Sequence, residues 1–259
     1  MNNIQFKLLL LAIGLPFFLN AQESNEQLAR KAADPTALIW QLQIEDYWKI
    51  KSNDGQKNAN NLRLRAVIPF NKTKYYPEHL LRITTNWQIQ YSGQQNLSNT
   101  EIFDLLIPKR YNWGAYSLGP IIQLPTHAPY DETQSILAFG IAVGISINTP
   151  KIEKWQLDIL IRYLDSFTND ANRISSLKIQ PSLTYHINNG YYLETEPEIS
   201  LDLYKQDNYI PINIRFGRAF SLRSLKINAY IEPEYSLVDS NNKNTQWGLR
   251  FGWRFILDK

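Results

Sequence analysis

The segment that most constrains this chain is the strand-like stretch from Thr245 to Leu257. Alternate positions carry apolar, largely aromatic side chains, while the positions between them carry mostly arginine, glycine and glutamine. Alternation with a period of two is typical of a β-strand whose two faces meet different surroundings. Its thirteen residues are long for a soluble sheet, whereas a tilted strand needs roughly 9–11 residues to cross a bilayer. The segment therefore predicts the closing strand of a transmembrane β-barrel, with lipid outside and a polar lumen inside.

The first residues are typical of a secretory signal peptide. Lys7 precedes an apolar run from Leu8 to Leu19, and Ala21 is a small residue in the position of a cleavage site. The run is shorter than the roughly 20 residues that a membrane-spanning helix needs. We therefore expect residues 1–21 to be a signal peptide cleaved near Ala21, residues 22–36 to form a short periplasmic segment with a helical turn or two, and residues 37–259 to form the barrel.

The amino-acid composition excludes several classes of protein. The chain has no cysteine, so it forms no disulfide and performs no thiol chemistry. Its net charge of +3, without a basic run, gives no indication of nucleic-acid binding. No second stretch is long and apolar enough for a membrane helix, and an exported chain without one can reside in a membrane only as a closed barrel.

Alternating segments of similar length follow one another along the chain, and tight turns such as Asn188-Asn189-Gly190 alternate with longer polar connections. We expect an all-β fold, a transmembrane antiparallel up-and-down β-barrel of about twelve strands. The long connection from Asn71 to His79 departs from this rule, so ten or fourteen strands stay open. The expected strands cover about residues 38–50, 61–70, 80–91, 101–108, 112–124, 135–148, 155–167, 175–187, 191–203, 209–220, 225–238 and 245–257.

Prolines interrupt several of these segments. Pro120, Pro181, Pro197 and Pro233 lie inside predicted strands, although proline cannot donate to a ladder of main-chain hydrogen bonds. We expect local bulges at these positions. The alternative is that each such segment is two shorter strands, as in a soluble sandwich.

Aromatic residues gather near the predicted strand ends. An apolar ring with a polar tip suits the headgroup level of a bilayer, so these residues predict two aromatic girdles. The alternative is an ordinary aromatic-rich β core. The set comprises Trp40, Tyr47, Trp48, Tyr91, Trp113, Trp155, Tyr163, Tyr185, Tyr191, Trp247 and Trp253.

The inward positions carry charges of both signs. A one-residue slip of the segment 191–203 would move its acidic side chains into lipid, which selects a single register. We expect a set of inward charges to line the lumen and to select any solute. The set is Arg63, Arg65, Arg82, Glu194, Glu196, Glu198, Arg215, Glu232, Glu234, Arg250 and Arg254.

Two arrangements of the lumen are compatible with this pattern. Segments 112–124 and 135–148 present small inward residues, including Gly119, Ala142 and Gly144, opposite the charged strands. Acids and arginines could pair and fill the lumen, or the small wall could leave a narrow polar pathway. In both cases the buried charges must be paired or hydrated.

Signals for an enzyme are weak. Of His79, His127 and His186, only His186 falls in a predicted strand, with Ser182 four residues before it on the same face. A hydrolase would also need an orienting acid or amide, and no phosphate-binding loop or metal motif occurs. Glu194, Glu196 and Glu198 could bind a cation, but a polar face beside basic residues explains them better. We predict no enzyme activity, no catalytic residue, no metal and no cofactor.

Several short motifs, in succession over nearly the whole exported chain, carry a family resemblance. They include the segment from Ala33 to Gln43, Leu64-Arg65-Ala66-Val67-Ile68-Pro69-Phe70 and Trp247-Gly248-Leu249-Arg250-Phe251-Gly252. With them the chain resembles the family of outer-membrane proteins labelled "MetA-pathway of phenol degradation". The resemblance implies an outer-membrane β-barrel and passage of small compounds, apolar or aromatic ones among them. One departure is that four residues follow Phe255, whereas barrels of this class often end on an aromatic residue that the assembly machinery reads.

Together these features predict an outer-membrane channel for passive passage of small solutes. The expected partners are membrane lipid, an unidentified small solute and the outer-membrane assembly machinery, with no nucleic acid. The alternative is a closed structural or surface-binding barrel without transport, and a soluble exported β protein is a third candidate.

Overall fold

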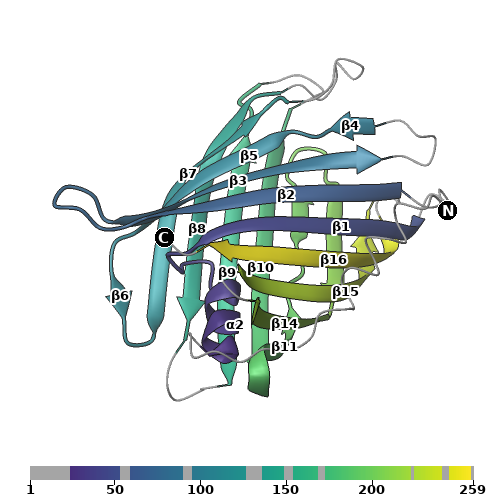
Figure 1. Ribbon diagram of the computed structural model, residues 1–259. Helices are drawn as coiled ribbons and strands as arrows, with labels where there is room; N and C mark the ends of the chain where they lie inside the picture. Colours follow the sequence, from purple (N-terminus) through teal and green to yellow (C-terminus); the bar gives the residue numbers. More distant parts are fainter. Residues whose placement is uncertain are drawn as a thin grey trace.

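The computed structural model describes residues 24–52, 59–89, 95–126, 136–148, 154–168, 173–222, 225–240 and 245–257. In this part of the chain one antiparallel sheet closes on itself, because β1 (Trp40–Ser52) pairs with both β2 (Ala59–Phe70) and β16 (Thr245–Leu257) (Figure 1). The expected signal peptide, residues 1–21, lies outside the described residues. Among the described helices, none combines the length and apolarity needed to cross a membrane.

The barrel wall consists of twelve strands, as the sequence predicts. Two of them are divided: β11 and β12 both pair with β10, and β13 and β14 both pair with β15. The short β4 and β6 only extend pairings of β3 and β7. The remaining bounds are β3 (Glu78–Ile89), β4 (Gln95–Leu97), β5 (Thr100–Ile107), β6 (Arg110–Tyr111), β7 (Gly114–Leu124), β8 (Ala138–Ile147), β9 (Trp155–Asp165), β10 (Ser175–His186), β11 (Tyr191–Thr195), β12 (Ile199–Asp202), β13 (Asn208–Asn213), β14 (Arg215–Leu222) and β15 (Leu225–Asp239).

The prolines affect the wall unequally. Pro120, Pro181 and Pro233 lie within continuous strands and pair there without a register shift, so the prediction of bulges at these three positions is wrong. The chain leaves the ladder around Pro197, between β11 and β12. A register shift separates Ile210 from Pro211 in β13. The divided strands stay in the same closed wall, so the alternative of a soluble sandwich is wrong.

The outer surface is an apolar belt. Leu42, Leu64, Phe139, Ile141 and Leu193 are among its exposed side chains, as expected where the wall faces lipid. Paired rings lie toward opposite ends of the wall, with Trp155–Tyr185 centroids 4.8 Å apart and Tyr235–Trp247 centroids 4.6 Å apart.

Tyr47 does not belong to the girdle where the sequence analysis placed it. Its side chain is buried, and its hydroxyl donates a hydrogen bond to Glu234 Oε1 at 2.6 Å. Tyr47 follows Glu45 by two positions in β1, so it shares the inward face of the strand.

Three luminal tyrosines lie flat over glycines of a neighbouring strand. A Cβ added to Gly217, Gly248 or Gly252 would lie within 2.3 Å of Tyr192, Tyr47 or Tyr230, respectively. Only glycine therefore lets these rings approach the wall.

The small inner wall of β7 and β8 does not border open space. Phe103, Leu105, Ile121, Leu160 and Leu164 form a buried cluster with the alanines of this wall. The interior is therefore apolar on this side, where the sequence analysis considered a polar pathway. Leu160 and Leu164 reach the cluster from β9, whose inward positions also carry Arg162.

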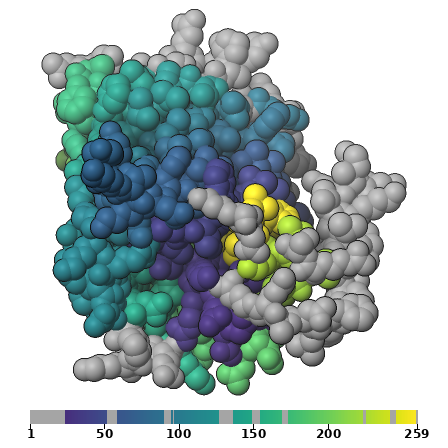
Figure 2. Space-filling model, turned by 60° about the vertical axis from the view of Figure 1, so that its left-hand side comes forward, coloured from purple at the N-terminus to yellow at the C-terminus, as the bar shows by residue number. Residues whose placement is uncertain are grey.

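The helix α2 (Asn25–Ala33) lies in the end of the barrel where β1 begins and β16 ends. Leu28, Ala29 and Ala32 are buried against the luminal side chains Tyr192 and Ile256. Ser24 caps the helix by accepting a hydrogen bond from the amide of Gln27. Figure 2, which brings this end forward, shows the purple N-terminal residues seated among the strands.

Tyrosine–glycine stacking makes Gly252 sensitive to substitution. We expect Gly252→Ala to displace Tyr230 from its 2.7 Å hydrogen bond to Glu45 and to destabilise the barrel by about 1–3 kcal/mol through overpacking. Urea unfolding in phospholipid vesicles measures this. In a Tyr230→Ala background the same substitution should cost much less, since the ring is gone. If Gly252→Ala lowered the free energy of unfolding equally with and without the Tyr230 ring, stacking would not explain the effect.

Candidate functional site

Arg215 is the centre of a luminal ion-pair network. Its guanidinium contacts Glu194 at 2.6 Å, Glu196 at 2.8 Å and Glu232 at 2.6 Å. It is almost fully buried and lies over the ring of Tyr230, 4.1 Å from the centroid. A buried charge is tolerated only when it is paired and hydrogen-bonded, and Arg215 meets both conditions.

Arg250 extends the network toward the end of the barrel opposite α2. It pairs with Glu232 and lies 3.4 Å from Glu234, and its guanidinium covers the ring of Tyr47. Glu234 also accepts a hydrogen bond from Tyr209 at 2.9 Å. Tyr47 and Tyr209 thus both donate to the carboxylate of Glu234, which Arg250 also contacts.

A second chain of ion pairs crosses the lumen. Arg63 contacts Glu45 at 3.3 Å and Glu198 at 3.8 Å, and Arg162 contacts Glu198 at 3.2 Å and also pairs with Glu101. These residues come from β1, β2, β5 and β9 and from the segment between β11 and β12. The charges therefore join opposite walls of the barrel rather than neighbouring strands alone.

The other predicted site residues lie near α2. Arg254 donates a hydrogen bond to the carbonyl of Ala32 at 2.8 Å and lies 3.7 Å from Glu196. Arg65 lies 4.0 Å from Glu45. Arg82 lies over the ring of Phe103, and among the described residues no carboxylate pairs with it.

The structure thus brings together all the predicted luminal residues except Arg82 into ion-pair contact. Glu45, Glu101, Arg162 and Tyr209 also belong to these contacts, although they were not among the predicted site residues. Period-two alternation places most of these side chains inside, but it does not indicate which strands face each other across the lumen. Whether any of these residues selects a solute stays a prediction.

Within the part of the chain that the structure describes, a luminal cavity lies on either side of the network. The vestibule, a cavity of about 220 Å³ at the end opposite α2, is bordered by Glu45, Arg63, Glu198, Glu234 and Arg250, among others. The second cavity, of about 60 Å³, lies between α2 and the strands and is bordered by Arg65, Arg82 and Arg254, among others. No residue lines both cavities.

The barrel wall has a seam, which we define as residues 195–199 and 210–214. β11 pairs with β14 up to Glu194 and Arg215, and β12 pairs with β13 from Ser200 and Tyr209, in the same register. Between these pairs the ladder is interrupted. Pro197 and Pro211 lie in this gap, and Pro181 of β10 faces Pro197 when the register of β10 with β11 and β12 is continued. Pro211 lacks the N–H donor that would face residue 198 across the seam, and Pro181 and Pro197 lack the donors that would join β10 to the same segment, which explains why both ladders are interrupted here.

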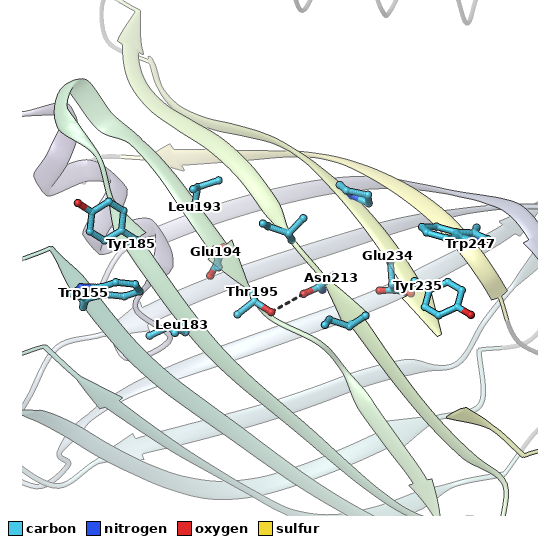
Figure 3. Close-up of a pocket in the computed structure, with 13 residues that line it drawn as sticks. Trp155, Leu183, Tyr185, Leu193, Glu194, Thr195, Asn213, Glu234, Tyr235 and Trp247 are labelled. Atoms are coloured by element: carbon cyan, nitrogen blue, oxygen red, sulfur yellow. Dashed lines mark hydrogen bonds between the residues drawn. The ribbon is translucent and has the colours of Figure 1, made fainter. Parts of the chain in front are cut away.

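A side chain bridges the seam. Asn213 Oδ1 accepts a hydrogen bond from the amide of Glu196 at 2.8 Å, and Asn213 Nδ2 donates to the carbonyl of Glu196 at 3.0 Å. The same Nδ2 donates to Glu232 at 3.1 Å, and the hydroxyl of Thr195 donates to Oδ1 at 3.4 Å. Asn213 therefore connects the seam to the ion-pair network, and Figure 3 shows its hydrogen bond with Thr195.

An apolar groove lies on the outer surface over the seam. It encloses about 840 Å³ and runs between the ring pairs Trp155–Tyr185 and Tyr235–Trp247 (Figure 3). Glu234 borders both this groove and the vestibule. At Glu234 of β15, which is paired with Asn213 of the seam, the two spaces are therefore separated by a single thickness of wall. The other lining residues are Leu183, Leu193, Glu194, Thr195, Ile212, Asn213, Ile214 and Pro233.

The buried histidine and serine of β10 are held by structural contacts. His186 Nε2 lies 3.2 Å from Gln156 Oε1, and Ser182 donates to Glu194 at 3.0 Å. Ser182 and His186 thus have different partners, and neither is aligned as a nucleophile with its base. Among the described residues, no group of three or more acidic or histidine side chains is arranged to hold a metal ion.

Comparison with solved structures shows that the fold is shared with outer-membrane β-barrels. No protein-family model matches the chain, and no curated protein matches its sequence. Among solved structures it is similar to the COG4313 outer membrane channel from Pseudomonas putida F1, with a TM-score of 0.60 and 11% identity over 87% of this chain and 99% of that one. It is also similar to the KdgM porin, with a TM-score of 0.55 and 12% identity over 83% and 98% of the two chains.

The same fold also carries catalysis in another protein. An active-site mutant of outer membrane phospholipase A from Escherichia coli has a TM-score of 0.50 and 11% identity, over 91% of this chain and 98% of that one. At such identities the similarity shows a shared fold, and a fold does not decide an activity. The resemblance to the family labelled "MetA-pathway of phenol degradation" is not confirmed by these comparisons and stays a prediction.

The network makes Arg215 critical for stability. We expect Arg215→Met to destabilise the barrel by about 3–5 kcal/mol, because it leaves buried carboxylates without their partner. Arg110→Met is the matched control, since the 2.7 Å pair of Arg110 with Glu78 is partly exposed and should contribute only about 0–1 kcal/mol. Urea unfolding in vesicles compares the two. Similar small losses would show that the lumen is hydrated well enough to solvate the carboxylates.

Proposed function

We propose that this protein is an outer-membrane channel that passes small apolar or aromatic solutes down their concentration gradient. The solute enters the vestibule, crosses the wall at the seam and leaves through the apolar groove into the bilayer. The observation that carries the proposal is the seam itself, where main-chain pairing between the two segments is absent and where Glu234 of the adjacent β15 borders both spaces. The proposal involves no catalytic step and no cofactor.

The orientation follows the rule for outer-membrane barrels. Both chain ends of the wall, at Trp40 and Leu257, lie together at the end that holds α2. Short turns and chain termini face the periplasm in such barrels, so the vestibule faces the outside. A cleaved signal peptide over residues 1–21 is part of the same proposal, since it provides export. Insertion would require the outer-membrane assembly machinery.

A straight path through the lumen is disfavoured. The ion pairs around Arg215 and Arg162 cross the centre, and α2 lies in the periplasmic end. Opening this path would separate buried opposite charges, which costs several kcal/mol for each pair that loses a partner. Crossing the seam requires no main-chain pair to be broken, because the described contacts across it are the side-chain hydrogen bonds of Asn213 and the ion pair of Glu196 with Arg215.

The groove favours an apolar solute. Its surface is built mainly from leucine, isoleucine, proline and aromatic side chains. Transfer from water to such surroundings is worth about 0.8 kcal/mol per CH₂ group, whereas an unpaired charge is strongly disfavoured there. We propose that Arg63, Glu198, Glu234 and Arg250, which line the vestibule, orient the polar end of the solute before it crosses.

The second candidate function is a closed structural or surface-binding barrel without transport. The filled centre of the lumen favours it. The two functions differ in whether apolar molecules cross the outer membrane faster when the protein is present.

A bulky side chain placed in the groove tests whether solutes pass through it. Ile212 lies in the groove and Ile141 on the lipid face of β8, with exposed fractions of 51% and 49%. We expect cells of a Gram-negative host that produce the protein to take up a phenylnaphthylamine dye faster than cells without it. Ile212→Trp should reduce this rate to nearly that of cells without the protein, because the indole occupies the groove, and Ile141→Trp should leave it unchanged.

Three outcomes would contradict the proposal in different ways. No acceleration by the folded, unaltered protein would favour the closed barrel. Equal effects of the two tryptophans would mean that the groove is not the route. Acceleration that persists with Ile212→Trp would direct attention back to the lumen.

A further inference from the structure

The carboxamide of Asn213 occupies the place of a missing main-chain pair. The pairs Glu194–Arg215 and Ser200–Tyr209 define one register, and in that register Asn213 faces Glu196. In an unbroken ladder the main chains of two facing residues would exchange hydrogen bonds. Here the side-chain amide of Asn213 provides both the acceptor and the donor for the main chain of Glu196.

Because a side chain takes the place of a main-chain pair, opening the wall here would not require two paired strands to separate. Main-chain pairs open only when the strands separate, whereas a side chain can turn about its own bonds, on a nanosecond scale when it is unrestrained. Asn213 is 5% exposed, and its Nδ2 is also bound to Glu232. Glu232 in turn pairs with Arg215 and Arg250. The orientation of one amide is therefore linked to the charges that border the vestibule.

We infer that Asn213 is the latch of the barrel wall, a positioning residue whose side chain holds the seam closed and whose rotation opens it toward the groove. The inference rests on the proposed route and identifies what controls it. A solute with a polar group in the vestibule would compete for Arg250, which lines the vestibule and pairs with Glu232, and would thereby weaken the hold of Glu232 on the Asn213 Nδ2. The latch thus makes opening depend on an occupied vestibule.

Hydrogen–deuterium exchange of the full protein in lipid nanodiscs tests the latch directly. We expect Asn213→Ala to accelerate exchange in residues 195–199 about tenfold, because two hydrogen bonds to Glu196 are lost, while β1 and β2 keep their protection. Asn213→Asp should do at least as much, since a carboxylate cannot donate to Glu232 and repels it. Asn228→Ala is the matched control, because Asn228 is also buried and accepts a 2.8 Å hydrogen bond from Tyr192, but lies away from the seam.

Dye uptake in cells separates this inference from the proposed function. Faster exchange at the seam together with faster dye uptake supports both. Faster exchange without a change in uptake supports the latch and contradicts the route. Unchanged exchange at the seam in Asn213→Ala, or the same change in Asn228→Ala, overturns the latch.

Thr195→Val covers the case in which the Asn213 variants fail to fold. It keeps the shape of a partly buried side chain and removes only the hydroxyl that donates to Asn213 Oδ1. We expect exchange at the four amides of residues 195–199, where Pro197 has none, to rise about twofold, because one weak hydrogen bond is lost. If exchange there does not change, Asn213 does not hold the seam and the inference is wrong.

Discussion

The structure depends on one constraint: a wall in contact with lipid must satisfy its main-chain N–H and C=O groups without water. Closure of β1 against β16 meets this requirement around the barrel. Prolines remove donors at the seam, and there the constraint is met by Asn213, which bonds both main-chain groups of Glu196. The position where the ladder fails is thus also where a single side chain carries the closure, and we propose that this is the mobile part of the wall.

The interior obeys a second constraint, that buried charge must be matched. Arginines lie over tyrosine rings, and the rings lie over glycines, so Gly252, Tyr230 and Arg215 form three successive layers. This layering places guanidinium groups deep in the lumen, where carboxylates from several strands reach them. The result is a closed centre with one space on each side. The proposed route avoids the centre because crossing the wall breaks fewer strong interactions than crossing the network.

The strands and their faces could be predicted because lipid and lumen impose opposite preferences on successive residues. The alternation in Thr245–Leu257 and the acidic face of residues 191–203 each select one register, which the structure confirms in β16 and in β11. Tyr47 was misplaced because an aromatic residue near a strand end resembles a girdle residue whichever way it points. Its partner Glu234 lies 187 residues away in the chain, and no local pattern connects the two.

The sequence by itself therefore predicted the barrel, a number of about twelve strands and most of the inward charges, since these depend on period-two alternation and on length. Only the tertiary structure decided which charges meet, that apolar side chains cover the small wall of β7 and β8, and that α2 enters the lumen. The seam also belongs to this second group. Pro181, Pro197 and Pro211 are separate interruptions along the chain, and only the pairing of neighbouring strands places them side by side, with Asn213 beside them to bridge the gap.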